Sequence, residues 1–248
     1  MGKKYYPVNI DVAGKKCLVV GGGAVGERKV RSLLDCGALV TLVSKSFTAG
    51  LERLADEGKV RAEKRGFEDG DVEGAFLVYC ATDDGALNRR VFETADKKSL
   101  LVNVVDQPAL CNFIVPAVVR KGSLLASVST SAAAPALAKK LKAVLAAAFD
   151  DGYAPLLEFL AEKRKTVKTL TDDIASRKKI FDCLIESPLS KLFAAAAAKS
   201  EGAACDLSVF DFDEYKKSNP EIIADAEKIF VEVCEKHLPR GEKTKNNK

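Results

Sequence analysis

Short apolar runs alternate with amphipathic segments over the first half of the chain. The apolar runs are rich in valine and leucine, as is typical of strands that are buried on both faces of a parallel sheet. We expect strands at residues 17–20, 38–44, 59–64, 75–82 and 100–106. Between them, apolar residues recur at intervals of three or four, which predicts helices at residues 26–36, 51–58 and 86–98. This βαβ succession predicts an α/β fold on a Rossmann-type, doubly wound parallel sheet.

A different pattern begins after residue 113. Residues 113–130 indicate two strands joined by a turn at Lys121-Gly122. A helix is expected to begin at Pro135, because a proline in the first turn of a helix gives up no hydrogen bond. Helical spacing continues from residue 153 to about 200, with an interruption at Pro188, and a last helix is expected at about 220–236.

These patterns divide the chain into three parts. We predict a Rossmann domain at 1–112, a small α+β segment at 113–150, and a C-terminal helical domain with a basic tail at 151–248. The strands of the second part carry apolar residues on both faces, namely Phe113, Ile114, Val115, Val118 and Val119. Such strands need more cover than one small domain supplies, so we expect this segment to pair two copies of the chain as a homodimer.

The composition limits the class of protein. The chain has 248 residues, of which 47% are hydrophobic and 30% charged, and its net charge is +4. No apolar run approaches the roughly 18 residues needed to cross a bilayer, so no membrane partner is expected. The seven cysteines form no C-x-x-C pair, which predicts neither a zinc site nor a disulfide framework and favours a reducing cytoplasm. The basic end, PRGEKTKNNK, lacks aromatic residues and is interpreted as a solvated tail rather than a nucleic-acid arm.

A glycine motif lies between the first predicted strand and helix. It reads Gly21-x-Gly23-x-x-Gly26, the spacing at which the first glycine permits a tight turn and the second lets the backbone approach a pyrophosphate. The third glycine lets the helix pack closely on the strand, and the helix N-terminus then faces the phosphates. A glycine-rich turn that binds nothing is the alternative, but the strand–turn–helix context favours a dinucleotide.

The end of the second strand leaves the choice of dinucleotide open. An acidic residue there would bind the ribose 2′-hydroxyl, but the stretch reads Val43-Ser44-Lys45-Ser46. Ser44 or Ser46 can hydrogen-bond a ribose, which suits NAD. Lys45 can equally bind a 2′-phosphate, which suits NADP.

Acidic residues follow the two later strands of the predicted sheet. CATDD ends at Asp84, and VNVVDQP contains Asp106; in open α/β sheets, ligands bind over such strand ends. We expect Asp106 to be partly buried and to serve as a catalytic acid or base, the alternative being an aspartate that caps the turn before Pro108. The single histidine, His237, lies near the end of the chain and is expected to be solvated, so acid–base chemistry falls to other side chains.

Four stretches taken together resemble one family. They are YYPVNIDVAGKKCLVVGGGAVGERKV, ATDDGALNRRV, VNVVDQPALCNFIVPAVV and LLASVSTSAAAPALAKKLK, and they cover about residues 5–145 in order. The chain resembles the precorrin-2 dehydrogenases, which include the N-terminal half of multifunctional siroheme synthases. The helical stretch 153–200 is similar, more loosely, to the helical end of that family.

The resemblance implies a reaction and a set of site residues. It implies oxidation of precorrin-2 to sirohydrochlorin with NAD⁺ by a homodimer and, in some members, insertion of Fe²⁺ or Co²⁺ into sirohydrochlorin. Asp106 matches the catalytic proton acceptor. The expected cofactor-binding residues are Gly21, Gly23, Ala24, Val25, Gly26, Ser44, Lys45, Ser46, Thr82 and Asn103. The expected substrate-binding residues are Asn112, Thr130, Arg120 and Lys139.

Two features bear on the substrate pocket. The family often carries SSGGxSP where this chain reads STSAAAP at 129–135, so Thr130 keeps a hydroxyl while the glycines are replaced. Precorrin-2 carries many carboxylates, so a basic cleft should attract it, and the candidates for the cleft wall are Arg120, Lys121, Lys139 and Lys140. Each is equally an ordinary solvated side chain.

Two other functions stay open from the sequence alone. One is a nonenzymatic, NAD-binding regulatory domain, and the other is a scaffold with a vestigial fold. The position of Asp106 after a strand and the extension beyond residue 113 favour the enzyme over the regulatory domain.

Overall fold

The computed structural model of the chain describes residues 4–199 and 210–239. It divides into two compact units. The first comprises Met1–Val115 and Thr130–Ala134, and the second comprises Pro116–Ser129 and Pro135–Lys248. Two of the segments interpreted from the sequence, the polar stretch at 200–206 and most of the basic tail, lie outside the described residues. The predicted three-part division stays a prediction.

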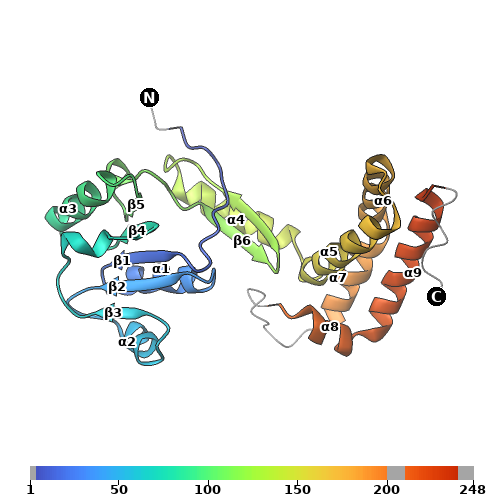
Figure 1. The fold of residues 1–248 in the computed structure, drawn as a ribbon, viewed down its shortest axis with the longest axis horizontal. Helices are drawn as coiled ribbons and strands as arrows, with labels where there is room; N and C mark the ends of the chain where they lie inside the picture. The colour runs from blue at the N-terminus through green and yellow to red at the C-terminus, as the bar shows by residue number, and fades with distance from the viewer. Residues whose placement is uncertain (1–3, 200–209, 240–248) are drawn as a thin grey trace. The chain divides into compact units, whose positions relative to one another are not determined.

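A five-stranded parallel sheet forms the centre of the first unit, in the order β3-β2-β1-β4-β5 (Figure 1). The strands are β1 (Lys16–Val20), β2 (Leu39–Val43), β3 (Arg61–Glu63), β4 (Leu77–Cys80) and β5 (Leu101–Val104). The helices are α1 (Ala24–Leu34), α2 (Ala49–Asp56) and α3 (Gly85–Asp96), with 3-10 turns η1 (Asp69–Val72) and η2 (Pro108–Leu110). The predicted Rossmann-type sheet is therefore confirmed.

The strand register brings the loops after β1, β2, β4 and β5 to one edge of the sheet. Val20 at the end of β1 lies opposite Val43 of β2 and Cys80 of β4, and Cys80 lies opposite Val104 of β5. The apolar runs predicted as strands extend up to two residues beyond these ends. The extra residues belong to the loops at the carboxyl edge, where the polar candidate residues also lie.

Helices cover both faces of the sheet, which explains why the strands are apolar on both sides. On one face, Val30 and Leu33 of α1 pack into a cluster with Val19 and Leu42. On the other face, Val91 and Ala95 of α3 pack with Val78 and Val102. Burial of each of these valine and leucine side chains contributes about 1.5–3 kcal/mol, so the first unit carries a hydrophobic core of its own.

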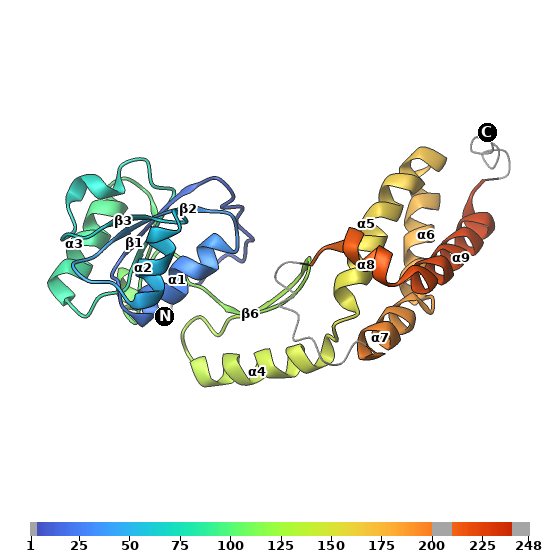
Figure 2. The same ribbon diagram turned by 90° about the horizontal axis from the view of Figure 1, so that it is seen from below.

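The second unit joins a β-hairpin to a set of helices. The hairpin pairs β6 (Ala117–Lys121) with β7 (Leu124–Val128) in antiparallel fashion, and the predicted turn is present, with Gly122 in the left-handed region. The helices are α4 (Pro135–Ala148), α5 (Tyr153–Leu170), α6 (Ile174–Glu186), α7 (Leu189–Lys199), α8 (Phe212–Ser218) and α9 (Pro220–His237). Helices α6 and α9 lie side by side in both views (Figures 1 and 2).

The helical boundaries follow local capping signals. The break predicted at Pro188 is confirmed, and a second break falls before Asp173, whose carboxylate accepts hydrogen bonds from Ala175 N and Ser176 N to begin α6. Helix α8 was not predicted; it begins at Asp211 in the same way. Helices α5, α6, α7 and α9 enclose a core that contains Phe159, Ile180, Leu184, Phe193 and Phe230.

Helix α4 presents an apolar face that the described chain leaves open. Leu137, Leu141 and Val144 are 49%, 41% and 58% exposed, and Ala138 is the only buried residue of the helix. These three residues share one face of α4, and none of the described residues covers that face. Within those same residues, no helix combines the length and the apolar character that a membrane span requires.

Candidate active site

The glycine turn after β1 is shaped by backbone atoms of neighbouring loops. Gly21 has φ +117°, and a Cβ there would lie 2.2 Å from the carbonyl oxygen of Ala81. A Cβ on Gly26 would lie 2.1 Å from the carbonyl oxygen of Gly21. Gly22, which the motif leaves unspecified, is equally confined, because its Cβ would lie 2.0 Å from the carbonyl oxygen of Ser46. No larger side chain fits at these three positions.

Gly23 differs from the other glycines of the turn. It is the N-cap of α1, and a Cβ there would meet nothing within 4 Å. The amides of the first helical turn, beginning at Ala24, have no acceptor within the helix, and Gly23 and Ala24 are exposed. This open helix N-terminus can bind a phosphate.

A cavity of about 320 Å³ opens beside the glycine turn at the carboxyl edge of the sheet. It brings together the first turn of α1 and the loops after β4 and β5, and its lining is Val25, Ala81, Thr82, Asp83, Val105, Asp106 and Gln107. The cavity thus joins two of the predicted cofactor-binding residues, Val25 and Thr82, to the predicted catalytic residue, Asp106. Asp83, which the sequence did not single out, lines it as well.

Asp106 is held by its backbone and not by its side chain. It adopts φ +59°, which aspartate tolerates better than most residues, and the flanking amides of Val105 and Gln107 donate to the carbonyls of Cys80 and Val104. The side chain is exposed, so the expected partial burial is wrong: the left-handed turn directs the residue out of the sheet. Among the described residues, no hydrogen bond or ion pair engages its carboxylate.

Thr82 is oriented by α3. Its hydroxyl donates to Asn88 Oδ1 at 2.6 Å, and Asn88 Nδ2 donates to the carbonyl of Thr82 at 3.0 Å. Asn88 is 1% exposed, so the loop after β4 is fastened to a buried amide. Behind it, burial raises the pKa of the Cys80 thiol to about 12, which keeps this cysteine protonated and unreactive.

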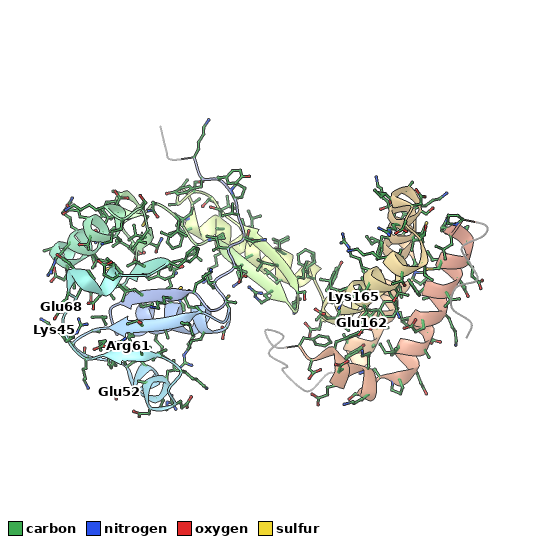
Figure 3. All side chains as sticks on the ribbon, viewed as in Figure 1. Lys45, Glu52, Arg61, Glu68, Glu162 and Lys165 are labelled. Carbon is green, nitrogen blue, oxygen red and sulfur yellow. The ribbon has the colours of Figure 1, made fainter. Side chains whose placement is uncertain are left out.

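The loop after β2 contains the residues expected on the adenosine side. Ser44 is half-buried, while Lys45 and Ser46 are exposed, and Lys45 lies at the surface of the first unit (Figure 3). The loop ends at Thr48, the N-cap of α2, whose hydroxyl donates to Glu27 Oε2 at 2.5 Å.

Glu27 of α1 is a residue that sequence reasoning missed. Besides Thr48, it pairs with Arg31 at 2.6 Å, and these two partners hold the pKa of its carboxyl below its usual value. Its contact with Thr48 spans residues that are 21 apart in the chain. The carboxylate therefore links α1 to the start of α2 and fixes the end of the loop that would face the adenosine.

The side-chain amides of Asn103 and Asn112 are engaged by main-chain atoms of the first unit. Asn103 Nδ2 donates to the carbonyl of Phe113 at 3.0 Å. Asn112 accepts from Val102 N at 2.8 Å and donates to the carbonyl of Leu100 at 2.7 Å, as a neighbouring strand would. These contacts fasten the segment after β5 to the sheet edge. Neither residue lines the cavity of Asp106, and a ligand role for either stays a prediction.

The residues expected around the substrate fall in both units. Thr130 is assigned to the first unit, where its hydroxyl accepts from Ala134 N at 3.2 Å. Arg120 on β6 and Lys139 on α4 belong to the second unit and are exposed. Between these elements, Ser131 and Ala132 have φ +52° and +67°. These are the positions at which the similar family carries glycine, and the left-handed backbone explains that preference.

His237 is not the solvated side chain that was expected. It is half-buried in the second unit, with Nε2 at 3.3 Å from the Sγ of Cys183, because the end of α9 packs on α6. Desolvation, followed by the charges of Lys179 and Lys236, lowers its pKa. Throughout the described ranges, no group of three or more His, Cys, Asp or Glu side chains is arranged to hold a metal ion.

Comparisons with known proteins agree with this geometry. Residues 8–117 match the family model described as "Putative NAD(P)-binding". The chain is 34% identical over 201 residues to a siroheme synthase of Nitrosococcus oceani, a match that covers 81% of this chain and 43% of that protein. It is 38% identical over 187 residues to the siroheme synthase of Pseudomonas entomophila, covering 75% and 40%.

A solved structure shows the same fold. The structure described as "SirC, precorrin-2 dehydrogenase" aligns with a TM-score of 0.67 and 24% identity, over 90% of this chain and 100% of that one. The chain spans about two fifths of the length of the curated relatives it matches, 43% and 40% in the two cases above. The resemblance predicted from the motifs is confirmed. Over about two fifths of their length the siroheme synthases are similar to this chain, and its residues 8–117 match the NAD(P)-binding family model.

Proposed function

We propose that this chain is an NAD⁺-dependent dehydrogenase that oxidises precorrin-2 to sirohydrochlorin. The observation that carries the proposal is the single cavity in which the first turn of α1 meets Asp106. A cofactor site and a carboxylate free to accept a proton are thereby adjacent. The names of the similar proteins, siroheme synthase and SirC, precorrin-2 dehydrogenase, support this substrate.

The residues of the glycine turn fit a dinucleotide. Gly21, Gly22 and Gly26 allow the turn to close, and Gly23 leaves the helix N-terminus open to the pyrophosphate. Ser44, Lys45 and Ser46 would border the adenosine, and Thr82 the end nearest Asp106. When bound, NAD⁺ supplies the hydride acceptor. We choose NAD⁺ over NADP⁺ because the similar family prefers it.

Asp106 is the proposed proton acceptor. Oxidation of precorrin-2 removes the equivalent of a hydride and a proton, and the carboxylate of Asp106 takes the proton. Its backbone is fixed in the left-handed turn, and none of the described residues competes for the side chain. A positioned general base of this kind contributes about 10²–10⁴-fold to the rate.

The direct test is an absorbance time course of the purified chain with precorrin-2 and NAD⁺. We expect formation of sirohydrochlorin that depends on both the protein and NAD⁺. A rate equal to that of the protein-free control would refute the dehydrogenase and favour the regulatory alternative. Faster turnover with NADP⁺ than with NAD⁺ would assign Lys45 to a 2′-phosphate instead.

A second activity, insertion of Fe²⁺ or Co²⁺ into sirohydrochlorin, is supported by Asp83. Metal insertion releases two pyrrole protons, and the cavity offers two carboxylates, Asp83 and Asp106. The macrocycle itself supplies the metal's nitrogen ligands, so no protein metal site is needed. Anaerobic incubation of the protein with sirohydrochlorin and Co²⁺, without NAD⁺, should yield the metallated spectrum faster than the protein-free control.

We further propose that the chain is a homodimer paired through segment 113–149. The open apolar face of α4, with Leu137, Leu141 and Val144, is the surface that a second copy would cover. Sedimentation at micromolar concentration should show a dimer, and a monomer would contradict this assignment. The free cysteines of the described residues suit the reducing cytoplasm proposed for the protein.

A further inference from the structure

Lys29 is a partly buried cation that none of the roles described above uses. It lies on α1, and its Nζ sits 5.0 Å from the centroid of the Tyr79 ring. Its helix neighbour Arg31 pairs with Glu27. By contrast, no carboxylate among the described residues forms an ion pair or hydrogen bond with Lys29.

The helix directs Lys29 toward the cavity of Asp106. Lys29 follows Val25, a residue of the cavity lining, by four positions, so the two share one face of α1. Long side chains on a helix lean toward its N-terminus, and the N-terminus of α1 lies at the carboxyl edge of the sheet. Burial and Arg28 lower the pKa of Lys29, and the carboxylate of Asp106 raises it by a smaller amount.

The ring beneath the ammonium is fixed in place. Tyr79 is 6% exposed and meets Phe113 edge to face, with ring centroids 5.6 Å apart. A cation over an aromatic face is attracted by the ring, but it loses hydration when it is partly buried. The ammonium of Lys29 is thus positioned over the ring and partly desolvated, and no carboxylate of the described residues pairs with it. It can therefore bind an anionic group of a ligand.

We propose that Lys29 binds a carboxylate of the tetrapyrrole substrate and thereby holds the reacting carbon beside Asp106. This inference rests on the proposed dehydrogenase function. The pyrophosphate of the cofactor is the other anion at this edge, but the open amides at the start of α1 already suit it. Lys29 lies five residues, about 7.5 Å of helix rise, beyond Ala24, and its side chain leans back along α1 toward the edge that holds Asp106.

The test compares Lys29→Gln and Lys29→Arg with the control Arg28→Gln. Arg28 is the adjacent cation and is exposed, so its replacement removes the same charge from the same helix. For Lys29→Gln, we expect the KM for precorrin-2 to rise about tenfold to a hundredfold, the usual loss for a charged hydrogen bond, with the KM for NAD⁺ within about twofold. Lys29→Arg should recover most of the loss, and Arg28→Gln should behave as the wild type.

A binding measurement separates this inference from the function on which it rests. Sirohydrochlorin binding, followed by fluorescence without NAD⁺, should weaken by a similar factor in Lys29→Gln but not in Arg28→Gln. An unchanged KM for precorrin-2, or a rise in the KM for NAD⁺ alone, would overturn the role of Lys29 while leaving the dehydrogenase intact. Absence of turnover in the wild-type chain would instead refute the proposed function.

Discussion

Helices α1 and α4 have similar amphipathic patterns and opposite surroundings. In α1, Val30 and Leu33 are 0% and 7% exposed, whereas Leu137, Leu141 and Val144 of α4 are 41–58% exposed. The apolar face of α1 packs on a sheet within its own unit, while nothing described covers the face of α4. A periodic pattern therefore predicts that a face will be covered, but it does not identify the partner.

The largest effect is expected at the carboxyl edge beside α1, where the proposed function depends on one exposed side chain. Asp106→Asn removes the proposed base without removing any packing, so turnover of precorrin-2 should fall by about 10²–10⁴-fold. Thermal unfolding and NAD⁺ binding should match the wild type. Turnover at the wild-type rate would exclude Asp106 from the mechanism.

A matched pair of leucine substitutions tests the contrast between the two helices directly. Leu33→Ala should lower the free energy of unfolding by about 2–5 kcal/mol, because it opens a cavity in the core. Leu141→Ala should change the stability of the monomer little, and should instead shift sedimentation from dimer toward monomer. If both variants lost the same stability and stayed dimeric, it would be wrong to infer that α1 packs within its own chain while α4 packs on a second copy.

The turn before α4 offers a smaller effect of opposite sign. Ser131 and Ala132 adopt left-handed conformations that cost L-residues about 1–2 kcal/mol each. Ala132→Gly relieves this strain and should raise the free energy of unfolding by about 0.5–1 kcal/mol after the entropy of glycine is subtracted. Ala133→Gly is the control, since its φ is not positive, and it should be neutral or destabilising in the same denaturant titration.

The smallest effect concerns the acid sensitivity of α1. The pKa of Glu27 is depressed in the folded state by Thr48 and Arg31, so this group stabilises the fold above its unfolded pKa. The contribution is lost as the pH falls below the ordinary value of 4.5 through the folded pKa. Glu27→Gln should therefore make the free energy of unfolding depend less on pH in that window. The measurement is a series of denaturant unfolding midpoints from about pH 3 to about pH 7. If the pH dependence of stability is the same in Glu27→Gln and the wild type, the pKa of Glu27 is the same in the folded and unfolded states.

Much of the fold could be predicted because its signals are local. The alternation of apolar runs predicted the sheet, and Pro188 and Lys121-Gly122 marked a break and a turn that the structure contains. The glycine motif likewise predicted the tight turn between β1 and α1. Each of these depends on residues within a few positions of one another.

The remaining features depend on contacts between distant residues. The exposure of Asp106 follows from a left-handed turn, and the amide of Asn112 is used by Leu100 and Val102, which lie 10 to 12 residues away. Glu27 meets Thr48 across 21 residues, and His237 meets Cys183 across 54. Hydrophobic periodicity carries no information about such pairs, so these roles emerged only with the structure.

The confinement of Gly21 and Gly22 has a consequence for protein engineering. A Cβ at either position would collide with the carbonyl oxygen of Ala81 or Ser46, so the turn is matched to the main chain of two other loops. A library that aims to alter cofactor preference would vary the loop at residues 44–48. Such a library can change the side chains of this loop, but it must keep the main-chain path at Ser46. Insertions or deletions in that loop would displace the glycine turn itself, and selection would then report lost folding instead of altered preference.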